Sequence, residues 1–506
     1  MDRARETPRV GPVLAALARG ALGDGYVPEV PERMLDGIAQ LSSASDRKQL
    51  LASLRAMNTR SGALLLTGKP VPVSWLSQTQ AEALLNKWRS SRIGLQRQLA
   101  TGVLSLALSS LYGRPGPEWN RIGYQGPMGD APKEPKRLSP LSIDHDEVLH
   151  CDVVIVGSGA GGGCVAGVLA GQGLDVVVLE KGGYRSESDF NHLEADASRD
   201  MYLYGMTLMN TDGNVRIIAG ATLGGGTVVN YTTSFKTPDF VLDEWTRITG
   251  IEAFSSGEFE ESLDEVSARL NVNLDSSAAG RRDELLETGL KKLGWHVDLL
   301  PRAVKGCTQD EQCGYCGFGC RPGAKQSTMR TYLEDAQAGG ARIVTGADVR
   351  SVRIADGKAT GVDAIVGPHR VTVTAKVVVV AAGSIETPAL LLRSGWAAAS
   401  DITSTCIPGP RLSASSTTTS GCGRARSRPV TRASSGTGTA ATGRSSKLSP
   451  SIPEPGQPSS RGKARRLTGS GWSGTRTIRS ARFSRGTRPT DGSRSPKTEV
   501  LGSRTS

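Results

Sequence analysis

The chain has 506 residues and a formal net charge of +12, and this length suits about three domains. The charge is uneven: residues 401–506 hold 16 Arg and 3 Lys against 4 acidic residues, a net of +15, so the first 400 residues carry −3. The main body is therefore an ordinary, mildly acidic globular sequence. Its charge argues against nucleic acid as a partner.

Helical periodicity marks the N-terminal region, which we delimit as residues 1–148. It is clearest in "QAEALLNKWRSSRIGLQRQLATGVLSLAL" at 80–108, where apolar residues recur every three or four positions. Pro and Gly at 114–137 interrupt it. The apolar runs are too short for a signal peptide or a membrane span, and cysteines without an export signal favour reduced thiols. We therefore expect a cytoplasmic protein with no transmembrane segment, and leave peripheral attachment to a membrane open.

The segment "DVVIVGSGAGGGCVAGVLAGQGLDVVVLEKGG" at 152–183 has the pattern of a dinucleotide site. A buried strand leads into a loop that contains Gly157, Ser158, Gly159 and Gly162. Gly157 permits a tight turn, Gly159 lets the backbone approach a pyrophosphate, and Gly162 lets the following helix pack closely on the strand. The N-terminus of that helix offers N–H groups to phosphates. Glu180, at the end of the second strand, is placed to accept hydrogen bonds from a ribose diol.

Two further motifs follow. "GATLGGGTVVNY" at 220–231 is a second glycine loop that a nicotinamide domain does not need; either it is another tight turn or its backbone packs against a flat ring. "VVVVAAGSIETPALLLRSG" at 377–395 predicts a strand, a glycine turn and a helix, with Pro388 in the first turn, where an N–H is not needed. Residues 236–300 are typical of amphipathic helices, and 342–380 of strands.

In this order, the three motifs resemble the glucose–methanol–choline (GMC) family of FAD-dependent oxidoreductases. "NRIGYQGP" and "CGYCGFGCRPGAKQSTMRTYLEDA" are similar to the long-chain fatty alcohol oxidase branch, with steroid oxidases as a more distant relative. The resemblance implies an α/β fold with a Rossmann-like FAD-binding domain and an incomplete substrate domain. We divide the rest of the chain into four parts. The first part of the FAD-binding domain covers 149–235, and a helical substrate or cap part covers 236–306. A Cys-rich loop with the second part of the FAD-binding domain covers 307–396, and a disordered tail covers 397–506.

The same resemblance assigns roles to particular residues. The first motif would hold the ADP half of FAD, and the second would wrap its pyrophosphate and flavin. The segment around Val349 would contact adenine, and "AAGSIETP" would lie against the flavin. Beyond the first motif, the residues so implied are Gly224, Gly225, Gly226, Thr227, Asn230, Val349, Gly383, Thr387 and Pro388.

Four cysteines lie close together in the sequence: Cys307, Cys313, Cys316 and Cys320. Such spacing could ligate zinc or an iron–sulfur cluster, because soft metals take several thiolates. The alternative is a glycine-rich loop with buried or structural thiols, which is the reading we adopt, because the family resemblance extends through this segment without requiring a metal. We assign no metal ligand.

The family pattern breaks at Trp396. The resemblance predicts Ser-Gly, an aliphatic residue and Gly, but the chain reads Ser394-Gly395-Trp396-Ala397. Read from the third base of each codon, these codons give NTG (Leu, Val or Met) and then GGC (Gly), which restores the pattern. Ser, Thr, Arg, Gly and Pro make up 77 of residues 401–506, a composition that GC-rich DNA gives out of frame. We predict a frame slip near Gly395 and a disordered tail; a real basic tail and a nucleic-acid arm are the alternatives.

The resemblance implies oxidation of the CH–OH group of long-chain or otherwise bulky apolar alcohols by hydride transfer to FAD. In the family a base, usually a His near the C-terminus, takes the hydroxyl proton. No His follows His369, so we assign no catalytic residue and predict that the chain as written is inactive. The electron acceptor stays open between O₂, a quinone and a cytochrome. The alternative is a non-catalytic FAD- or metal-binding protein with a basic interaction tail.

Overall fold

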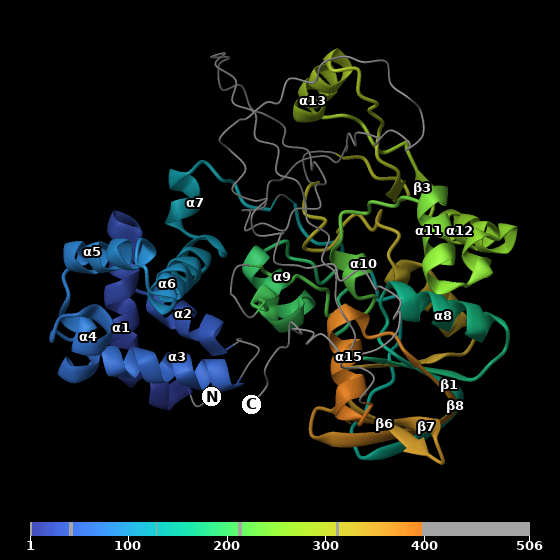
Figure 1. Ribbon diagram of the computed structural model, residues 1–506, viewed down its shortest axis with the longest axis horizontal. Coiled ribbons are helices and arrows are strands. Elements are labelled where there is room, and N and C mark those ends of the chain that lie inside the picture. Colours follow the sequence, from blue (N-terminus) through green and yellow to red (C-terminus); the bar gives the residue numbers. More distant parts are fainter. Residues whose placement is uncertain (1–2, 40–43, 128, 211–214, 310–312, 397–506) are drawn as a thin grey trace, which may run out of the picture. The chain divides into compact units, whose positions relative to one another are not determined.

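The computed structural model (Figure 1) describes most of the first 396 residues: 3–39, 44–127, 129–210, 215–309 and 313–396. The predicted disorder and frame slip of the tail lie outside these residues.

The N-terminal region is helical, as predicted, and has a core of its own. Buried side chains such as Leu17 and Trp88 pack together in it. The periodic stretch at 80–108 forms two helices rather than one. The helices are α1 (Arg3–Leu22), α2 (Val30–Ala39), α3 (Ala44–Met57), α4 (Arg60–Thr67), α5 (Gln78–Arg89), α6 (Gly94–Tyr112) and α7 (Pro117–Arg121). Within the described ranges, we find no helix with the length and apolar character needed to cross a membrane.

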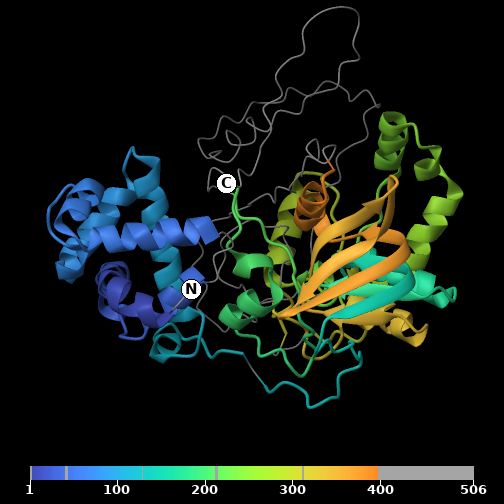
Figure 2. The same ribbon diagram turned by 90° about the horizontal axis from the view of Figure 1, so that it is seen from below.

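A six-stranded sheet organises the second half of the described chain, with the order β5-β2-β1-β8-β7-β6. The strands are β1 (Glu147–Val156), β2 (Val176–Glu180), β5 (Arg342–Thr345), β6 (Ala347–Ala355), β7 (Lys358–Val366) and β8 (His369–Val380). The first four in this order run parallel, and β7 and β6 continue the sheet antiparallel. Figure 2 shows the orange strands of the last segment beside the teal β1. The strands predicted at 342–380 are confirmed.

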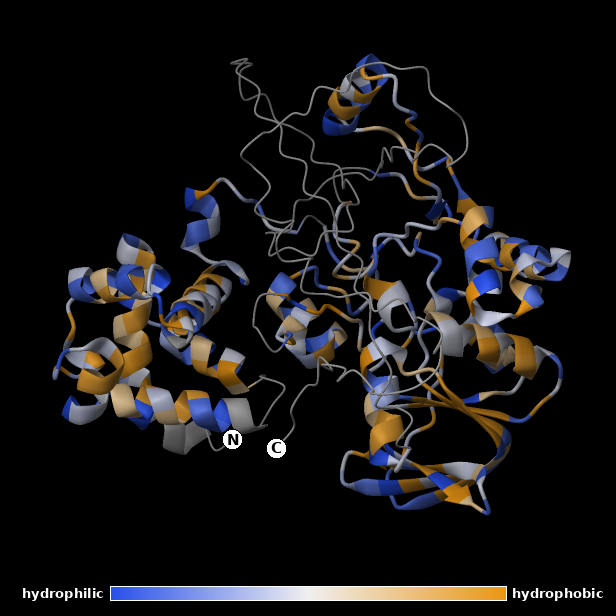
Figure 3. Ribbon diagram, viewed as in Figure 1, coloured by the Kyte–Doolittle hydropathy of each residue, from blue (hydrophilic) through white to orange (hydrophobic). Residues whose placement is uncertain are grey.

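Each face of the sheet has its own core. Ile155 and Val178 belong to one buried cluster, whereas their neighbours Val154 and Val177 belong to the other. Because both faces are covered there, β2 and the last four residues of β1 are buried throughout. In β6 buried and more exposed residues alternate, and Figure 3 shows hydrophilic as well as hydrophobic residues in β6 and β7. On the first face, helix α8 (Ala160–Gly171) contacts α14 (Tyr332–Ala338).

The helices predicted between residues 236 and 300 are also present. They are α11 (Asp239–Thr249), α12 (Gly257–Arg269) and α13 (Arg281–Lys292). A two-stranded antiparallel ladder follows them, formed by β3 (Val272–Asn273) and β4 (Arg302–Ala303). Two shorter helices, α9 (Glu194–Met201) and α10 (Gly226–Val229), precede them.

The prediction for Pro388 is wrong. Helix α15 (Gly383–Arg393) begins at Gly383, so Pro388 lies inside the helix and not in its first turn. The reason is the end of β8: Ala381 still donates its N–H to the carbonyl of Val156, and the chain then turns at Gly383, whose φ is +82°. Glycine adopts this conformation without a steric penalty, so the helix can start five residues before the proline.

Candidate functional site

Three chain segments that are far apart in sequence meet at the carboxyl edge of the parallel strands. Val156, the last residue of β1, pairs with Leu179 of β2 and with Val380 of β8. Gly157, Glu180 and Ala381 therefore follow or end neighbouring strands on the same edge. Ligands of open α/β sheets bind at this edge, so the structure brings the first and third motifs together.

The glycines of the first motif are required by close backbone contacts. Gly157 has a φ of +98°, and a Cβ added there would lie 2.5 Å from the carbonyl oxygen of Ala381. A Cβ on Gly162 would lie 1.9 Å from the carbonyl oxygen of Gly157. Both distances are far shorter than any van der Waals contact. Gly159 is the N-cap of α8, and no side chain caps this helix, which leaves its positive end available to an anion.

Glu180 does not simply face a ligand; it holds the first loop. Its Oε2 accepts hydrogen bonds from the backbone N–H of Ser158 at 3.0 Å and from the Ser158 hydroxyl at 2.6 Å. Its Oε1 accepts one from the N–H of Gly182 at 2.8 Å. Burial raises the pKa of this carboxyl, while these donors favour its charged form. Among the described residues, Oε1 accepts this one bond, which leaves it a lone pair for a ribose hydroxyl.

The second glycine loop is tied directly to the first. Gly224 donates its N–H to the hydroxyl of Ser158 at 2.9 Å. Gly225 has a φ of +55° and a ψ of −141°, and a Cβ on it would lie 2.8 Å from the Cα of Gly159. The two loops therefore touch through bare backbone. A chain of hydrogen bonds runs from Glu180 through Ser158 to Gly224.

The remaining residues of this loop are arranged around short polar contacts. The Thr227 hydroxyl donates to the carbonyl of Gly224 at 2.6 Å, and Asn230 Oδ1 accepts from the N–H of Thr232 at 3.0 Å. Gly226 and Asn230 are exposed, and an added Cβ at Gly226 would meet no atom within 4 Å. This side of the loop is therefore open, whereas Gly224 and Gly225 are buried.

Two residues that sequence reasoning did not single out hold the loops in place. The Thr328 hydroxyl lies 3.2 Å from each of the carbonyl oxygens of Ser158 and Gly224, so it bridges both loops. Lys325 is buried, and its Nζ donates to the carbonyls of Val228 at 2.6 Å and of Asn230 at 2.7 Å. Both lie in "GAKQSTMRT", a stretch that the family resemblance includes but that gave no role to its polar residues.

The third motif meets the end of β2 through charged side chains. Glu386 accepts a hydrogen bond from the Tyr204 hydroxyl at 2.8 Å and lies 3.6 Å from Nζ of Lys181. Gly383 is exposed, and Thr387 and Pro388 are half-buried on the same helix. They share the carboxyl edge with the two glycine loops.

Val349 differs from the other predicted site residues. Its side chain is only 5% exposed and packs into the core cluster of the second face. Its carbonyl oxygen accepts a hydrogen bond from Arg393 at 3.4 Å. An adenine contact at this position would therefore involve the backbone and the neighbours of Val349 rather than its side chain.

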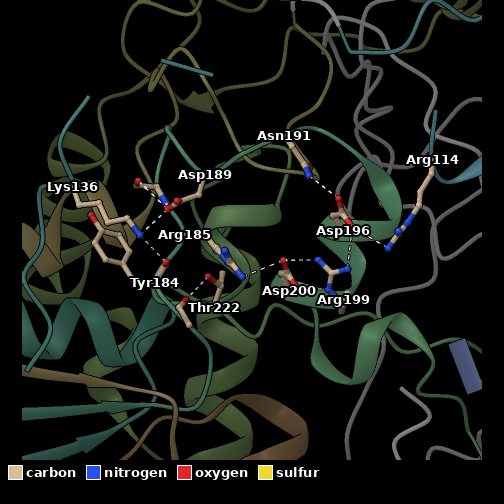
Figure 4. Close-up of polar contacts among 12 residues, drawn as sticks. Arg114, Lys136, Tyr184, Arg185, Asp189, Asn191, Asp196, Arg199, Asp200 and Thr222 are labelled. Carbon is tan, nitrogen blue, oxygen red and sulfur yellow. Dashed lines mark hydrogen bonds and ion pairs between the residues drawn. The ribbon is translucent and has the colours of Figure 1, made fainter. Parts of the chain in front are cut away.

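A cluster of ion pairs lies over α9 (Figure 4). Asp200 lies 3.2 Å from Arg185, Asp196 lies 3.0 Å from Arg199, and the Lys136 ammonium lies 2.9 Å from Asp189. Arg185, Asp189, Asp196 and Asp200 line a small hollow. Its basic side chain, Arg185, is paired with Asp200, so the hollow is poorly suited to a pyrophosphate. Across the described ranges, no group of three or more His, Cys, Asp or Glu is placed to hold a metal ion.

The comparisons with known proteins agree with this geometry. Residues 152–197 match the model of the FAD binding domain, and residues 198–413 match that of the GMC oxidoreductases. Among curated proteins, the chain is 38% identical over 268 residues to long-chain-alcohol oxidase FAO4B of Arabidopsis thaliana, covering 50% of this chain and 35% of that protein. It is 31% identical over 402 residues to FAO1 of the same plant, covering 68% and 53%.

Two more distant similarities complete the comparison. The chain is 27% identical over 282 residues to a cholesterol oxidase of Mycobacterium tuberculosis, covering 48% of this chain and 47% of that protein. A solved structure of pyridoxine 4-oxidase from Mesorbium loti matches with a TM-score of 0.37 and 18% identity, covering 48% of this chain and 52% of that one. The chain spans about a third to a half of the length of the first curated relatives it matches.

Residues 152–197 thus belong to an FAD-binding domain. The uncapped N-terminus of α8, the bare contact between Gly159 and Gly225 and the free lone pair of Glu180 all suit a dinucleotide, so the residues present fit FAD. More specifically, the chain contains a GMC oxidoreductase domain and is homologous to the plant long-chain-alcohol oxidases.

Proposed function

We propose that residues 149–396 bind FAD along the carboxyl edge of the sheet. The observation that carries this proposal is the hydrogen-bonded chain from Glu180 through Ser158 to Gly224, because it joins the two glycine loops into one continuous backbone surface. Such a surface, at the N-terminus of α8, attracts phosphate through free N–H groups and the helix dipole.

Each predicted residue then has a task in this cradle. The loop from Gly157 to Gly162 holds the ADP half, and the free lone pair of Glu180 accepts from the ribose. The second loop wraps the pyrophosphate and flavin with the residues Gly224, Gly225, Gly226, Thr227 and Asn230. The backbone around Val349 meets the adenine. The N-terminal half of α15, with Gly383, Thr387 and Pro388, lies against the flavin.

We further propose that the intact enzyme of this type oxidises the CH–OH group of long-chain or otherwise bulky apolar alcohols. FAD, when bound, accepts the hydride from the carbinol carbon. The names of the homologous long-chain-alcohol oxidases support the substrate class. The chain's own part in this reaction is to orient the cofactor and to exclude water from the carboxyl edge.

Three of the five histidines are poorly placed to act as a general base at the carboxyl edge, which supports the proposal that this chain is inactive as written. His369 begins β8 at the end of the strand remote from the site, and His150 lies within β1. His192 is buried. A general base must lie within hydrogen-bond reach of the alcohol hydroxyl, and its help is worth about 10²–10⁴ in rate.

The test compares the chain as written with a version in which one base near codon 395 is deleted. Both proteins are denatured and their supernatants analysed for flavin and nicotinamide, and both are assayed with dodecanol and an artificial electron acceptor. We expect FAD in both and alcohol oxidation only in the edited chain. Nicotinamide without flavin would contradict the cofactor assignment, and activity of the unedited chain would contradict its inactivity. Inactivity of an edited chain that holds FAD would contradict the substrate class.

A further inference from the structure

The helices α3 to α6 lie in a strongly basic part of the chain. Residues 47–117 contain ten basic residues and one acidic residue, Glu82, whereas the first 400 residues together carry −3. This part of the chain therefore presents an excess of positive charge. Six of its bases lie between residues 60 and 97, and all six are exposed: Arg60, Lys69, Lys87, Arg89, Arg92 and Arg97.

The same stretch exposes large apolar side chains. Leu65 is 84% exposed and Trp75 is 69% exposed, and Leu64 and Ile93 are exposed as well. Both leucines lie on α4, whose Ala63 is buried, so this helix is apolar on the side that faces solvent as well as on its inner side. Single exposed apolar residues are normal on a protein surface, but a group of them beside basic side chains marks an interaction surface.

The chain returns along α4 after the helix ends. The helix has eight residues and is capped at its C-terminus by Gly68, whose φ is +80°. The Ser74 hydroxyl then donates to Oδ1 of Asn58, which lies just before α4. Trp75 therefore lies near the beginning of the helix and Leu65 near its end. Eight helical residues span about 12 Å, so these two exposed side chains belong to one small region.

The ends of α5 and α6 add basic residues to this region. Nζ of Lys87, in the last turn of α5, donates to the carbonyl of Thr67 at 3.4 Å. Nε2 of Gln96, in the first turn of α6, donates to the carbonyl of Leu66 at 3.4 Å. The connection between α5 and α6, residues 90–93, is thereby held beside the end of α4. Apolar and basic side chains from three helices thus gather at one place.

We propose that this place, the α4 surface, binds the face of an anionic lipid bilayer. It is formed by residues 60–97 alone and does not rest on the proposed function. The apolar side chains enter the boundary between headgroups and acyl chains, where tryptophan is favoured, and the bases approach the anionic headgroups. The residues that carry the proposal are Leu64, Leu65, Lys69, Trp75, Lys87 and Ile93.

The combination of charge and exposed apolar area selects this partner. A nucleic acid would be attracted by the bases, but it has no use for exposed leucines. A protein partner of ordinary composition would cover the apolar side chains, but it would leave the excess of positive charge uncompensated. An anionic bilayer complements both features at once, because it offers an apolar interior beneath a negatively charged surface.

The test measures whether Trp75 enters the bilayer. The full chain is mixed with vesicles of phosphatidylcholine and phosphatidylserine in which the phosphatidylcholine is brominated on its acyl chains, since bromine quenches a nearby tryptophan. We expect quenching that is lost in Trp75→Phe. Trp295→Phe is the matched control, because Trp295 is also exposed but follows α13. The basic residues 401–506 can also attract such vesicles, so binding alone would not assign the surface, whereas quenching of Trp75 does.

Two sets of variants separate the apolar and the electrostatic contributions. Leu65→Ser should raise the lipid concentration for half of the Trp75 quenching at least about tenfold, and Leu285→Ser, at an exposed leucine of α13, should not. Lys69→Gln together with Lys87→Gln should raise it about fivefold for each charge removed. The control for this pair is the neutralisation of both lysines at the end of α13, residues 291 and 292, which should leave the quenching unchanged. Vesicles of phosphatidylcholine alone should quench little.

Four results would overturn the proposal. The first is quenching that is the same in Trp75→Phe and in the parent. The second is equal quenching by vesicles with and without phosphatidylserine, which would remove the role of the charges. The third is a lower midpoint of thermal unfolding in Leu65→Ser than in the parent, since Leu65 would then pack against the protein. The fourth is binding of an RNA oligonucleotide that depends on Lys69 and Lys87 while vesicles leave Trp75 unquenched, which would identify a nucleic acid as the partner.

Discussion

His192 should make the folded chain sensitive to acid, because it is a titratable group that is buried in the folded state. The residue is 4% exposed, and neither ring nitrogen has a hydrogen-bond partner among the described residues. Its ring stacks on that of Tyr315, with the centroids 4.6 Å apart and 11° between the planes. Burial, together with the positive charge of Arg321, lowers the pKa of His192 to about 3.

The sign and size of the effect follow from linkage. Between its ordinary pKa of about 6.5 and the folded value, the unfolded chain binds a proton at His192 that the folded chain does not. Stability is therefore complete above this window and falls as the pH is lowered through it. Each pH unit inside the window costs about 1.4 kcal/mol, so going from pH 7 to pH 5 should cost about 2 kcal/mol from this residue alone.

The assay is urea unfolding of the full chain, followed by tryptophan fluorescence at pH 7 and pH 5. In the His192→Phe variant, which keeps a ring for stacking but cannot bind a proton, the loss between the two pH values should be about 2 kcal/mol smaller than in the parent. Tyr315→Phe is the matched control, because it keeps the stack and should leave the pH dependence unchanged. The reasoning fails if His192→Phe loses as much stability on acidification as the parent does.

Three further predictions concern the cofactor cradle. Gly162→Ala should lower the midpoint of thermal unfolding or prevent folding, since its Cβ would lie 1.9 Å from the Gly157 carbonyl oxygen. The control is Gly171→Ala on the same helix, where an added Cβ meets no atom within 4 Å; it should leave stability unchanged or raise it by up to about 1 kcal/mol. Equal unfolding midpoints of the two variants would refute the contact. Glu180→Ala should weaken FAD retention by about 1–3 kcal/mol, measured by fluorescence of released flavin; unchanged retention would remove Glu180 from the site. Ser158→Ala should also weaken retention, by about 1–2 kcal/mol, although it leaves the carboxylate in place; retention equal to that of the parent would count against the hydrogen-bonded chain.

The sequence was informative where local rules apply. Gly157 and Gly162 were predicted from the fingerprint spacing, and the structure needs glycine at both because of backbone contacts. The strands were predicted from their apolar runs. The prediction for Pro388 was wrong because the preference of proline for the first turn of a helix is weak. The start of α15 is fixed by the end of β8, and the end of β8 depends on pairing with β1.

Other features could not be predicted because they depend on contacts between distant segments. Lys325 and Thr328 bind backbone carbonyls that lie about a hundred or more residues away in the chain, and a carbonyl carries no sequence signature. Sequence motifs therefore located the cradle, but not the side chains that hold its loops together.

Glu180 shows why a fingerprint position can have two tasks that only the structure separates. The acid was predicted to bind ribose, yet three of its hydrogen bonds come from Ser158 and Gly182. These donors, together with the charge of the neighbouring Lys181, favour the charged form of the buried carboxylate. They also fix the turn that we propose meets the phosphates. Removing the carboxylate loses both tasks, whereas Ser158→Ala loses the two bonds of the hydroxyl, to Glu180 and to Gly224, and keeps the bonds from the backbone N–H groups. The difference in FAD retention between Glu180→Ala and Ser158→Ala therefore measures the ribose contact together with the bonds from the backbone N–H groups. The effect of Ser158→Ala itself measures the joining of the two loops.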